Sequence, residues 1–109
     1  MSGHDDERVD AVFAALSDPT RRSVLGRLAG GTAASATELA AELPVSRQAV
    51  TKHLQMLGHA GLVTPTREGR EVRYSITPAP LGDAVEWMTD VGAQWDRRLA
   101  RLRGRLEKR

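Results

Sequence analysis

Residues 37–63 read TELAAELPVSRQAVTKHLQMLGHAGLV, and this stretch decides the fold. Apolar side chains recur at helical spacing on both sides of a proline-containing turn. The spacing predicts a short helix over residues 37–43 and a longer one over residues 46–60. Ser46 is a good N-cap for the second helix, and Gly61 is suited to end it. Two helices joined by so short a turn form a helix-turn-helix.

The second helix has two chemically different faces. Val50, Leu54 and Leu57 form an apolar stripe that is expected to face a core. Steps of 100° per residue place polar side chains opposite the stripe or flanking it: Arg47, Gln48, Thr51, Lys52, Gln55 and His59. Amides can pair with adenine edges, whereas Arg and Lys can pair with guanine edges or phosphate. We therefore expect this helix to enter the major groove of duplex DNA, although a plain solvated face is the alternative.

Two other side chains of this helix are expected to help in binding. Ser46 and the free N–H groups of the first turn can meet a phosphate. His53 lies near the edge of the core, where a structural role or a phosphate contact is expected.

A β-hairpin is predicted directly after this helix, over residues 63–76. Two runs rich in Val, Thr, Tyr and Ile are separated by a turn that contains Gly69. The hairpin carries three arginines, Arg67, Arg70 and Arg73. A basic hairpin beside a DNA-reading helix is a wing, so these arginines are expected to contact the minor groove or the sugar-phosphate backbone.

The remaining segments predict a mainly α-helical single domain with this small β-hairpin, over residues 8–109. Residues 1–7 are expected to be a disordered tail. Helices are predicted over residues 8–16 and 81–106, and residues 32–36 are expected to be an irregular connector. No alternation of strands and helices occurs, which disfavours an α/β enzyme.

The last predicted helix carries a long apolar stripe at steps near four and three residues. A domain of this size offers little core to receive all of it, so we expect a homodimer, with packing within one chain as the alternative. The expected interface residues are Val9, Val12, Phe13, Leu81, Val85, Met88, Trp95 and Leu99. Pairing would set two reading helices about 34 Å apart, which predicts an inverted-repeat operator.

Three segments of the chain resemble a known protein family. Residues 46–63 resemble the reader helix of the ArsR family of winged helix-turn-helix regulators. Residues 16–25 resemble the start of the second helix in that family, and residues 67–76 resemble its wing. The resemblance covers about residues 8–77 and implies a homodimer that represses a nearby operon. It also implies that Arg47, Gln48, Thr51 and Lys52 face the groove, with Thr51 standing where the family usually has Ser.

Many members of that family sense metal ions, but this chain resembles a branch without the metal-binding residues. It has no Cys, and no His follows His59 to join the carboxylates of Asp83, Glu86 and Asp90. Borderline metals prefer imidazole or thiolate ligands. We therefore expect no metal and no cofactor.

Composition and motifs limit the remaining classes of function and the expected location. No nucleophile motif or phosphate loop is present, so an enzyme is not expected. No apolar run is long enough to span a membrane and the acidic start is no secretory signal, so a cytoplasmic location is expected. The net charge is only +2, yet residues 46–75 hold five Lys or Arg against two Glu. A protein-interaction module, or a regulator with a small-molecule effector in a pocket near the last helix, stays open as an alternative.

Overall fold

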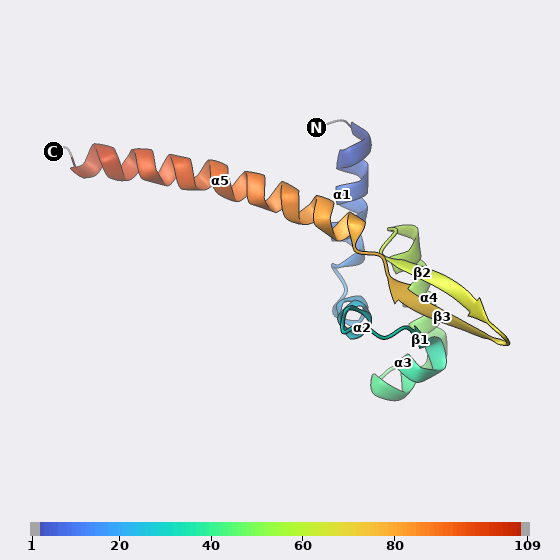
Figure 1. Ribbon diagram of the computed structural model, residues 1–109. Coiled ribbons are helices and arrows are strands. Elements are labelled where there is room, and N and C mark those ends of the chain that lie inside the picture. The colour runs from blue at the N-terminus through green and yellow to red at the C-terminus, as the bar shows by residue number, and fades with distance from the viewer. Residues whose placement is uncertain (1–2, 108–109) are drawn as a thin grey trace.

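The computed structural model describes residues 3–107, with side chains for residues 6–107 (Figure 1). The described chain is mainly helical with a small antiparallel sheet, as predicted. Its elements are α1 (Gly3–Ala15), α2 (Pro19–Ala29), β1 (Ala34–Ser35), α3 (Ala36–Glu42), α4 (Arg47–His59), β2 (Val63–Glu68), β3 (Glu71–Ile76) and α5 (Ala79–Glu107).

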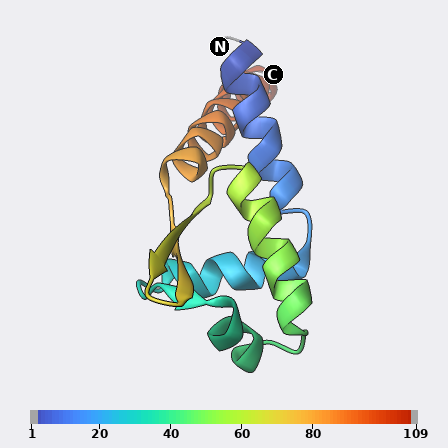
Figure 2. The ribbon, with the colours of Figure 1, turned by 90° about the vertical axis from the view of Figure 1, so that its right-hand side faces the viewer.

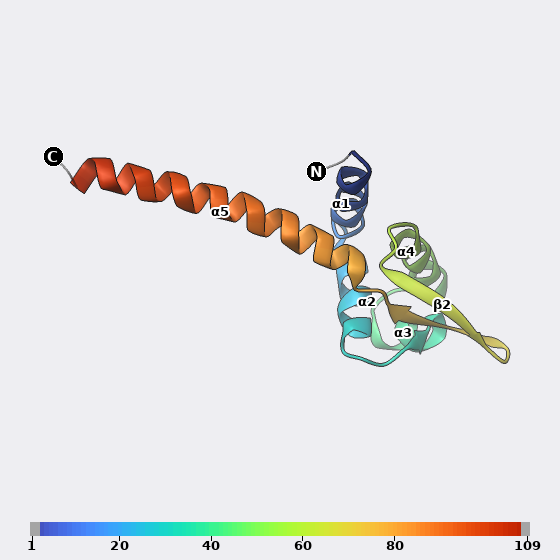
Figure 3. The same ribbon diagram turned by 45° about the horizontal axis from the view of Figure 1, so that its top comes forward.

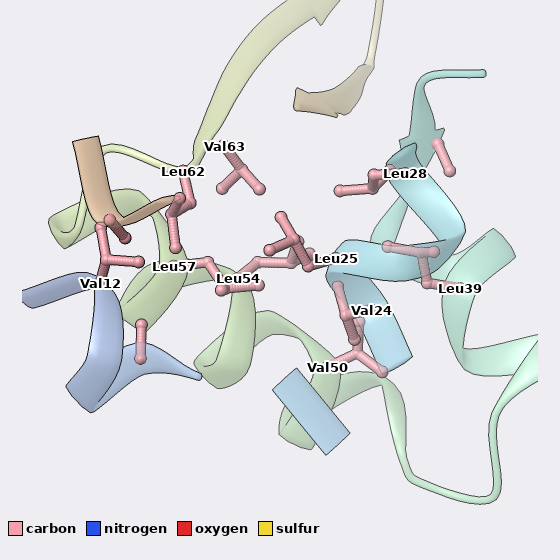
Figure 4. Close-up of a cluster of buried hydrophobic side chains, with 13 residues drawn as sticks. Val12, Val24, Leu25, Leu28, Leu39, Val50, Leu54, Leu57, Leu62 and Val63 are labelled. Atoms are coloured by element: carbon pink, nitrogen blue, oxygen red, sulfur yellow. The ribbon is translucent and has the colours of Figure 1, made fainter. Parts of the chain in front are cut away.

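One apolar core joins the helix-turn-helix to the rest of the domain (Figure 4). Val50, Leu54 and Leu57 of α4 are at most 1% exposed, so the predicted stripe is confirmed. They meet Leu28 of α2 and Leu39 of α3 in the same cluster. Full burial of one such side chain stabilises the fold by roughly 1.5–3 kcal/mol. The core therefore fixes which face of α4 is left to solvent.

The hairpin forms with the predicted boundaries to within one residue. β2 and β3 pair from Val63–Ile76 to Glu68–Glu71. Gly69 in the two-residue turn has a φ of 63°, which glycine adopts at no steric cost. A tight turn of this kind matches the twist of the two strands and fixes their register.

The sheet has a third strand that the sequence does not reveal. β1 lies within the stretch expected to be an irregular connector, and it pairs with β3 through Ala34–Tyr74 and Ser35–Arg73. The strand order is β1-β3-β2. A two-residue strand is too short to show alternation, so only its long-range partner identifies it.

The junction of α1 and α2 is built from helix caps. The Asp18 carboxylate accepts a hydrogen bond from the Arg21 N–H at 2.9 Å, and Pro19 is the first residue of α2. The side chain of Arg21 donates to the Ala15 carbonyl at 2.7 Å, and that of Arg22 donates to the Leu16 carbonyl at 2.6 Å. These arginines satisfy carbonyls that the end of α1 leaves free.

The start of α1 differs from the expected disordered tail over residues 1–7. Residues 3–7 are helical, and residues 1–2 lie outside the described residues. Asp6 and Glu7 fall near the N-terminus of the helix, where negative charge interacts favourably with the helix dipole. The polar composition that suggested a tail therefore also suits a helix start.

α5 makes the molecule elongated, because most of it projects from the domain (Figures 1 and 3). The radius of gyration is 18.8 Å, against about 13 Å for a compact domain of this length. The first turns pack on the domain through Ala84, which is buried, and Leu81, which is half-buried. Within residues 3–107, no helix combines the length and the apolar character needed to cross a membrane.

Candidate nucleic-acid interface

The polar face of α4 is exposed on the surface of the domain. Arg47, Gln48, Lys52 and Gln55 are all exposed, while the opposite stripe is sealed in the core. The helix and the hairpin lie on the side of the domain away from the projecting end of α5 (Figures 1 and 2). A straight helix with one buried and one free polar face has the geometry that groove insertion requires.

The first turn of α4 is held by hydrogen bonds that also set the direction of its side chains. The Ser46 hydroxyl caps the helix by accepting from the Ala49 N–H at 3.1 Å. The Thr51 hydroxyl donates to the Arg47 carbonyl at 3.0 Å. Ser46 thus stabilises the exposed helix end, and Thr51 is half-buried with its hydroxyl bonded to the helix backbone.

A shallow open hollow connects α4 with the hairpin. It is lined by Ser35, Ala36, Thr37, Arg47, Thr51, Arg70, Glu71, Val72 and Tyr74. Arg47 from α4 and Arg70 from the hairpin turn therefore border one concave surface. Arg67 is also exposed, on the outer strand of the hairpin. The structure thus brings Arg47 of α4 and Arg70 of the hairpin to one surface of the domain.

Arg73 behaves differently from the other two arginines. Its side chain is only 21% exposed and donates to Glu38 at 2.6 Å. It also donates to the Ala33 carbonyl at 2.6 Å. The hydrogen bond from Arg73 holds the pKa of the Glu38 carboxyl below its ordinary value. These contacts direct the Arg73 guanidinium to Glu38 of α3 and to the carbonyl just before β1, so its donors are engaged within the chain.

His53 also faces the protein rather than the solvent. Its side chain is 20% exposed, and Nδ1 lies 3.8 Å from the Asp18 carboxylate at the start of α2. The Arg21 N–H, and next the nearby imidazole, hold the pKa of the Asp18 carboxyl below its ordinary value. This geometry supports the structural role for His53, joining α4 to α2, over a phosphate contact.

Comparisons with known proteins agree with this arrangement. Residues 16–66 match the model of a helix-turn-helix domain family. The transcriptional repressor SdpR of Bacillus subtilis is 36% identical over 77 residues, which are 71% of this chain and 84% of SdpR. An ArsR-like transcriptional regulator from Rhodococcus sp. RHA1 is 47% identical with a TM-score of 0.76, over 88% of this chain and 90% of that one.

This chain belongs to the ArsR family. It is a winged helix-turn-helix transcription regulator with a DNA-binding domain, and the proteins that match it are regulators rather than enzymes. A further relative is the homodimeric winged helix-turn-helix DNA-binding domain Mb0332 from Mycobacterium bovis. That domain is 27% identical with a TM-score of 0.62, over 85% of this chain and 82% of that one.

The described residues form no cluster of candidate metal ligands. Among residues 6–107, no group of three or more His, Cys, Asp or Glu side chains could hold an ion together. Asp83, one of three carboxylates considered from the sequence, instead accepts a hydrogen bond from Arg8 at 2.8 Å.

The structure divides the predicted interface residues of this ArsR-family chain into two groups. Val9 is 3% exposed and Val12 is fully buried in the chain's own core, so neither is available to a partner. Leu81 packs against the same core. The other members of the set are 36–57% exposed: Phe13, Val85, Met88, Trp95 and Leu99.

Sequence reasoning missed several residues that shape the interface. Thr37 and Tyr74 line the hollow beside α4. Glu38 orients Arg73. The spacing of Ser35 and Glu38 is that of a capping box, a signal that could have placed the start of α3. The role of Tyr74 has no comparable local signal, because it depends on the pairing of β1 with β3.

Proposed function

We propose that this chain is a sequence-specific transcription repressor that binds an inverted-repeat operator as a homodimer. α4 enters the major groove, and the hairpin contacts the neighbouring backbone or minor groove as a wing. The observation that carries the proposal is the exposed polar face of α4, which shares one open hollow with the exposed Arg70 of the hairpin. Acting on genomic DNA, such a regulator works in the cytoplasm.

The exposed groups divide by the chemistry they offer. Gln48 and Lys52 stand on the solvent side of α4, one turn apart, and can reach base edges in a groove about 12 Å wide. Arg47 and Arg70 border the hollow, where a phosphate group of the DNA backbone would pass. We assign base reading to the first pair and backbone positioning to the second.

The apolar surface that one chain leaves uncovered supports the pairing of two chains. α5 exposes a row of large apolar side chains, and Trp95 among them is 57% exposed. The related Mb0332 domain is homodimeric. Two reading helices related by two-fold symmetry would match two half-sites about one helical turn apart.

A docking module for another protein is a weaker explanation of the same face. Protein interfaces centre on aromatic and apolar anchors. The exposed side of α4 instead offers amides and cations, with Met56 as its one large exposed apolar side chain in the described part of the chain.

The test is binding to the DNA upstream of the chain's own gene, measured at two salt concentrations. Gln48→Ala should lose about 1–3 kcal/mol on the preferred sequence and little on unrelated duplexes. Arg70→Ala should weaken binding to all duplexes and lower the salt slope by about one unit.

Two matched variants serve as controls. Gln94→Ala removes an exposed amide from α5, and Arg70→Lys keeps the charge of the wing. Both should bind like the parent. If Gln48→Ala and Arg70→Ala also bind like the parent, the proposed interface is wrong.

A further inference from the structure

One arginine on the central strand of the sheet lies among three carboxylates. The Arg73 guanidinium donates to Glu38 of α3 at 2.6 Å. It also lies 3.5 Å from a carboxylate oxygen of Glu71 on β3 and 3.8 Å from one of Glu68 on β2. We name these four residues the Arg73 cluster. Its contacts join the first helix of the helix-turn-helix to both strands of the wing.

The carboxylates of the cluster need a cation between them. Glu68 and Glu71 are directly opposed across β2 and β3, beside the hairpin turn. Like charges in that arrangement destabilise a strand pair. The Arg73 guanidinium supplies the opposite charge, and its hydrogen bond to Glu38 raises the pKa of Arg73 above its ordinary value. The cluster therefore stabilises the wing at the same time as it ties the wing to α3.

A further contact of Arg73 constrains where the wing meets the helix-turn-helix. The guanidinium donates to the Ala33 carbonyl at 2.6 Å, just before β1. β1 leads directly into α3, whose first turn holds Glu38. One half-buried side chain thus links β3 to both ends of that short segment. Because the guanidinium is planar and its donors point in fixed directions, these bonds constrain the orientation of the hairpin relative to α3.

We propose that Arg73 is a positioning residue for DNA binding, which holds the wing at a fixed angle to the helix-turn-helix and touches no DNA itself. This inference rests on the proposed function, in which Arg70 of the wing and Arg47 of α4 meet the DNA backbone. Those two side chains border one hollow, so both can contact the backbone only if the wing keeps its place relative to α4. α3 is the link, because it packs on α4 and Arg73 ties the wing to it.

The position of Glu71 gives the cluster a second effect on the same site. Glu71 lines the hollow together with Arg47 and Arg70. A carboxylate at that place repels a phosphate, and the neighbouring Arg73 guanidinium offsets part of its charge. Glu71→Gln should therefore tighten DNA binding about threefold, within the range of an exposed charge interaction. Unchanged or weaker binding would contradict this second effect.

Glu38→Gln distinguishes positioning from direct contact by the sign of its effect on DNA binding. The hollow is lined by residues other than Glu38. If Arg73 contacts a phosphate, Glu38 competes with DNA for the guanidinium, and its removal should tighten binding. If Arg73 positions the wing, loss of the link should weaken binding to the preferred sequence about tenfold, although the chain has lost a negative charge. Unchanged or tighter binding by Glu38→Gln would overturn the inference.

Arg27 and Glu42 provide a matched control. They form an ion pair at 2.7 Å that joins α2 to α3, and Arg27 also donates to the Thr32 carbonyl at 3.0 Å. This pair has the same chemistry as Arg73 and Glu38, but its contacts lie in α2, α3 and the segment between them. Glu42→Gln removes the same charge from α3 and should bind DNA at least as tightly as the parent. Equal weakening by the two variants would show a general effect on α3 and overturn the inference.

The placement of the wing can also be measured without DNA, because the chain has no cysteine and spin labels can be attached at chosen sites. Ala41→Cys on α3 and Arg67→Cys on β2 put two labels at exposed positions. Labelled chain is diluted with unlabelled chain, so that distances within one copy are measured. Glu38→Gln should broaden the distance distribution, and Glu42→Gln should leave it like that of the parent.

The two measurements separate this inference from the proposed function. A distance distribution that Glu38→Gln leaves unchanged would overturn the positioning role, even if the parent binds its operator. A parent that binds no DNA would overturn the proposed function and with it the role of Arg73 in DNA binding, whatever the label distances show.

Discussion

Replacing Trp95 by alanine should weaken self-association about a hundredfold while leaving the fold of each chain intact. A tryptophan can bury roughly 200 Å² of surface. Trp95 is 57% exposed, so about 110 Å² remain for a partner, worth about 3 kcal/mol at about 25 cal/mol per Å². Each dimer contains two such side chains, but coverage at an interface is incomplete and association has costs of its own. We therefore take the value for one chain as the expected total, which is about two powers of ten in the dissociation constant.

The assay is sedimentation equilibrium over a dilution series, with Gln94→Ala as the neighbouring control on the same helix. Within its own chain, Trp95 contacts the Arg98 guanidinium at 5.8 Å, an exposed interaction that contributes little to folding. The melting temperature of the diluted monomer should therefore stay close to that of the parent. A Trp95→Ala chain that dimerises within threefold of the parent would refute the claim that this stripe forms the interface.

Three further outcomes follow from the structure. Leu54→Ala should cost about 2–5 kcal/mol in the free energy of unfolding, since Leu54 is 1% exposed and its loss leaves a cavity beneath α4; a loss under 1 kcal/mol by urea denaturation would contradict the packing. Gly69→Ala should destabilise the hairpin by about 1–2 kcal/mol through its positive φ alone, because the added Cβ would meet no atom within 4 Å; a neutral result would show that the turn has another conformation. The pKa of Glu38 in the folded chain lies below its ordinary value. The ionised carboxylate therefore stabilises the fold when the pH is above the ordinary pKa, and this stabilisation is lost as the pH falls through the lowered pKa. Urea midpoints at about pH 5 and pH 3 should fall further for the parent than for Glu38→Gln, and equal falls would argue against the Arg73 contact.

Local signals in the sequence predict most of the helix-turn-helix. The apolar repeat of Val50, Leu54 and Leu57 orients α4, and Ser46 and Asp18 mark helix starts through short-range caps. Gly69 marks the hairpin turn. These features depend on residues a few positions apart, so they can be recognised without a structure.

The differences arise where contacts join distant parts of the chain. Arg73 looks like a wing arginine in the sequence, but its partner Glu38 is 35 positions away. The two residues of β1 form a strand only because β3 lies beside them. Val12 has the same apolar character as an interface residue, and only the fold shows that it is fully buried in its own core. The sequence therefore indicates which residues belong to the candidate site, but the role of each depends on long-range contacts that only the structure shows.

The central claim is that α4 occupies the major groove in two copies. Methylation protection of guanine N7 on the upstream DNA tests it directly, because that atom lies in the major groove. The parent should protect two segments whose centres are about 10–10.5 base pairs apart, and Gln48→Ala should lose that protection at matched concentration. Bound protein that leaves guanine N7 unprotected in both segments would contradict the account.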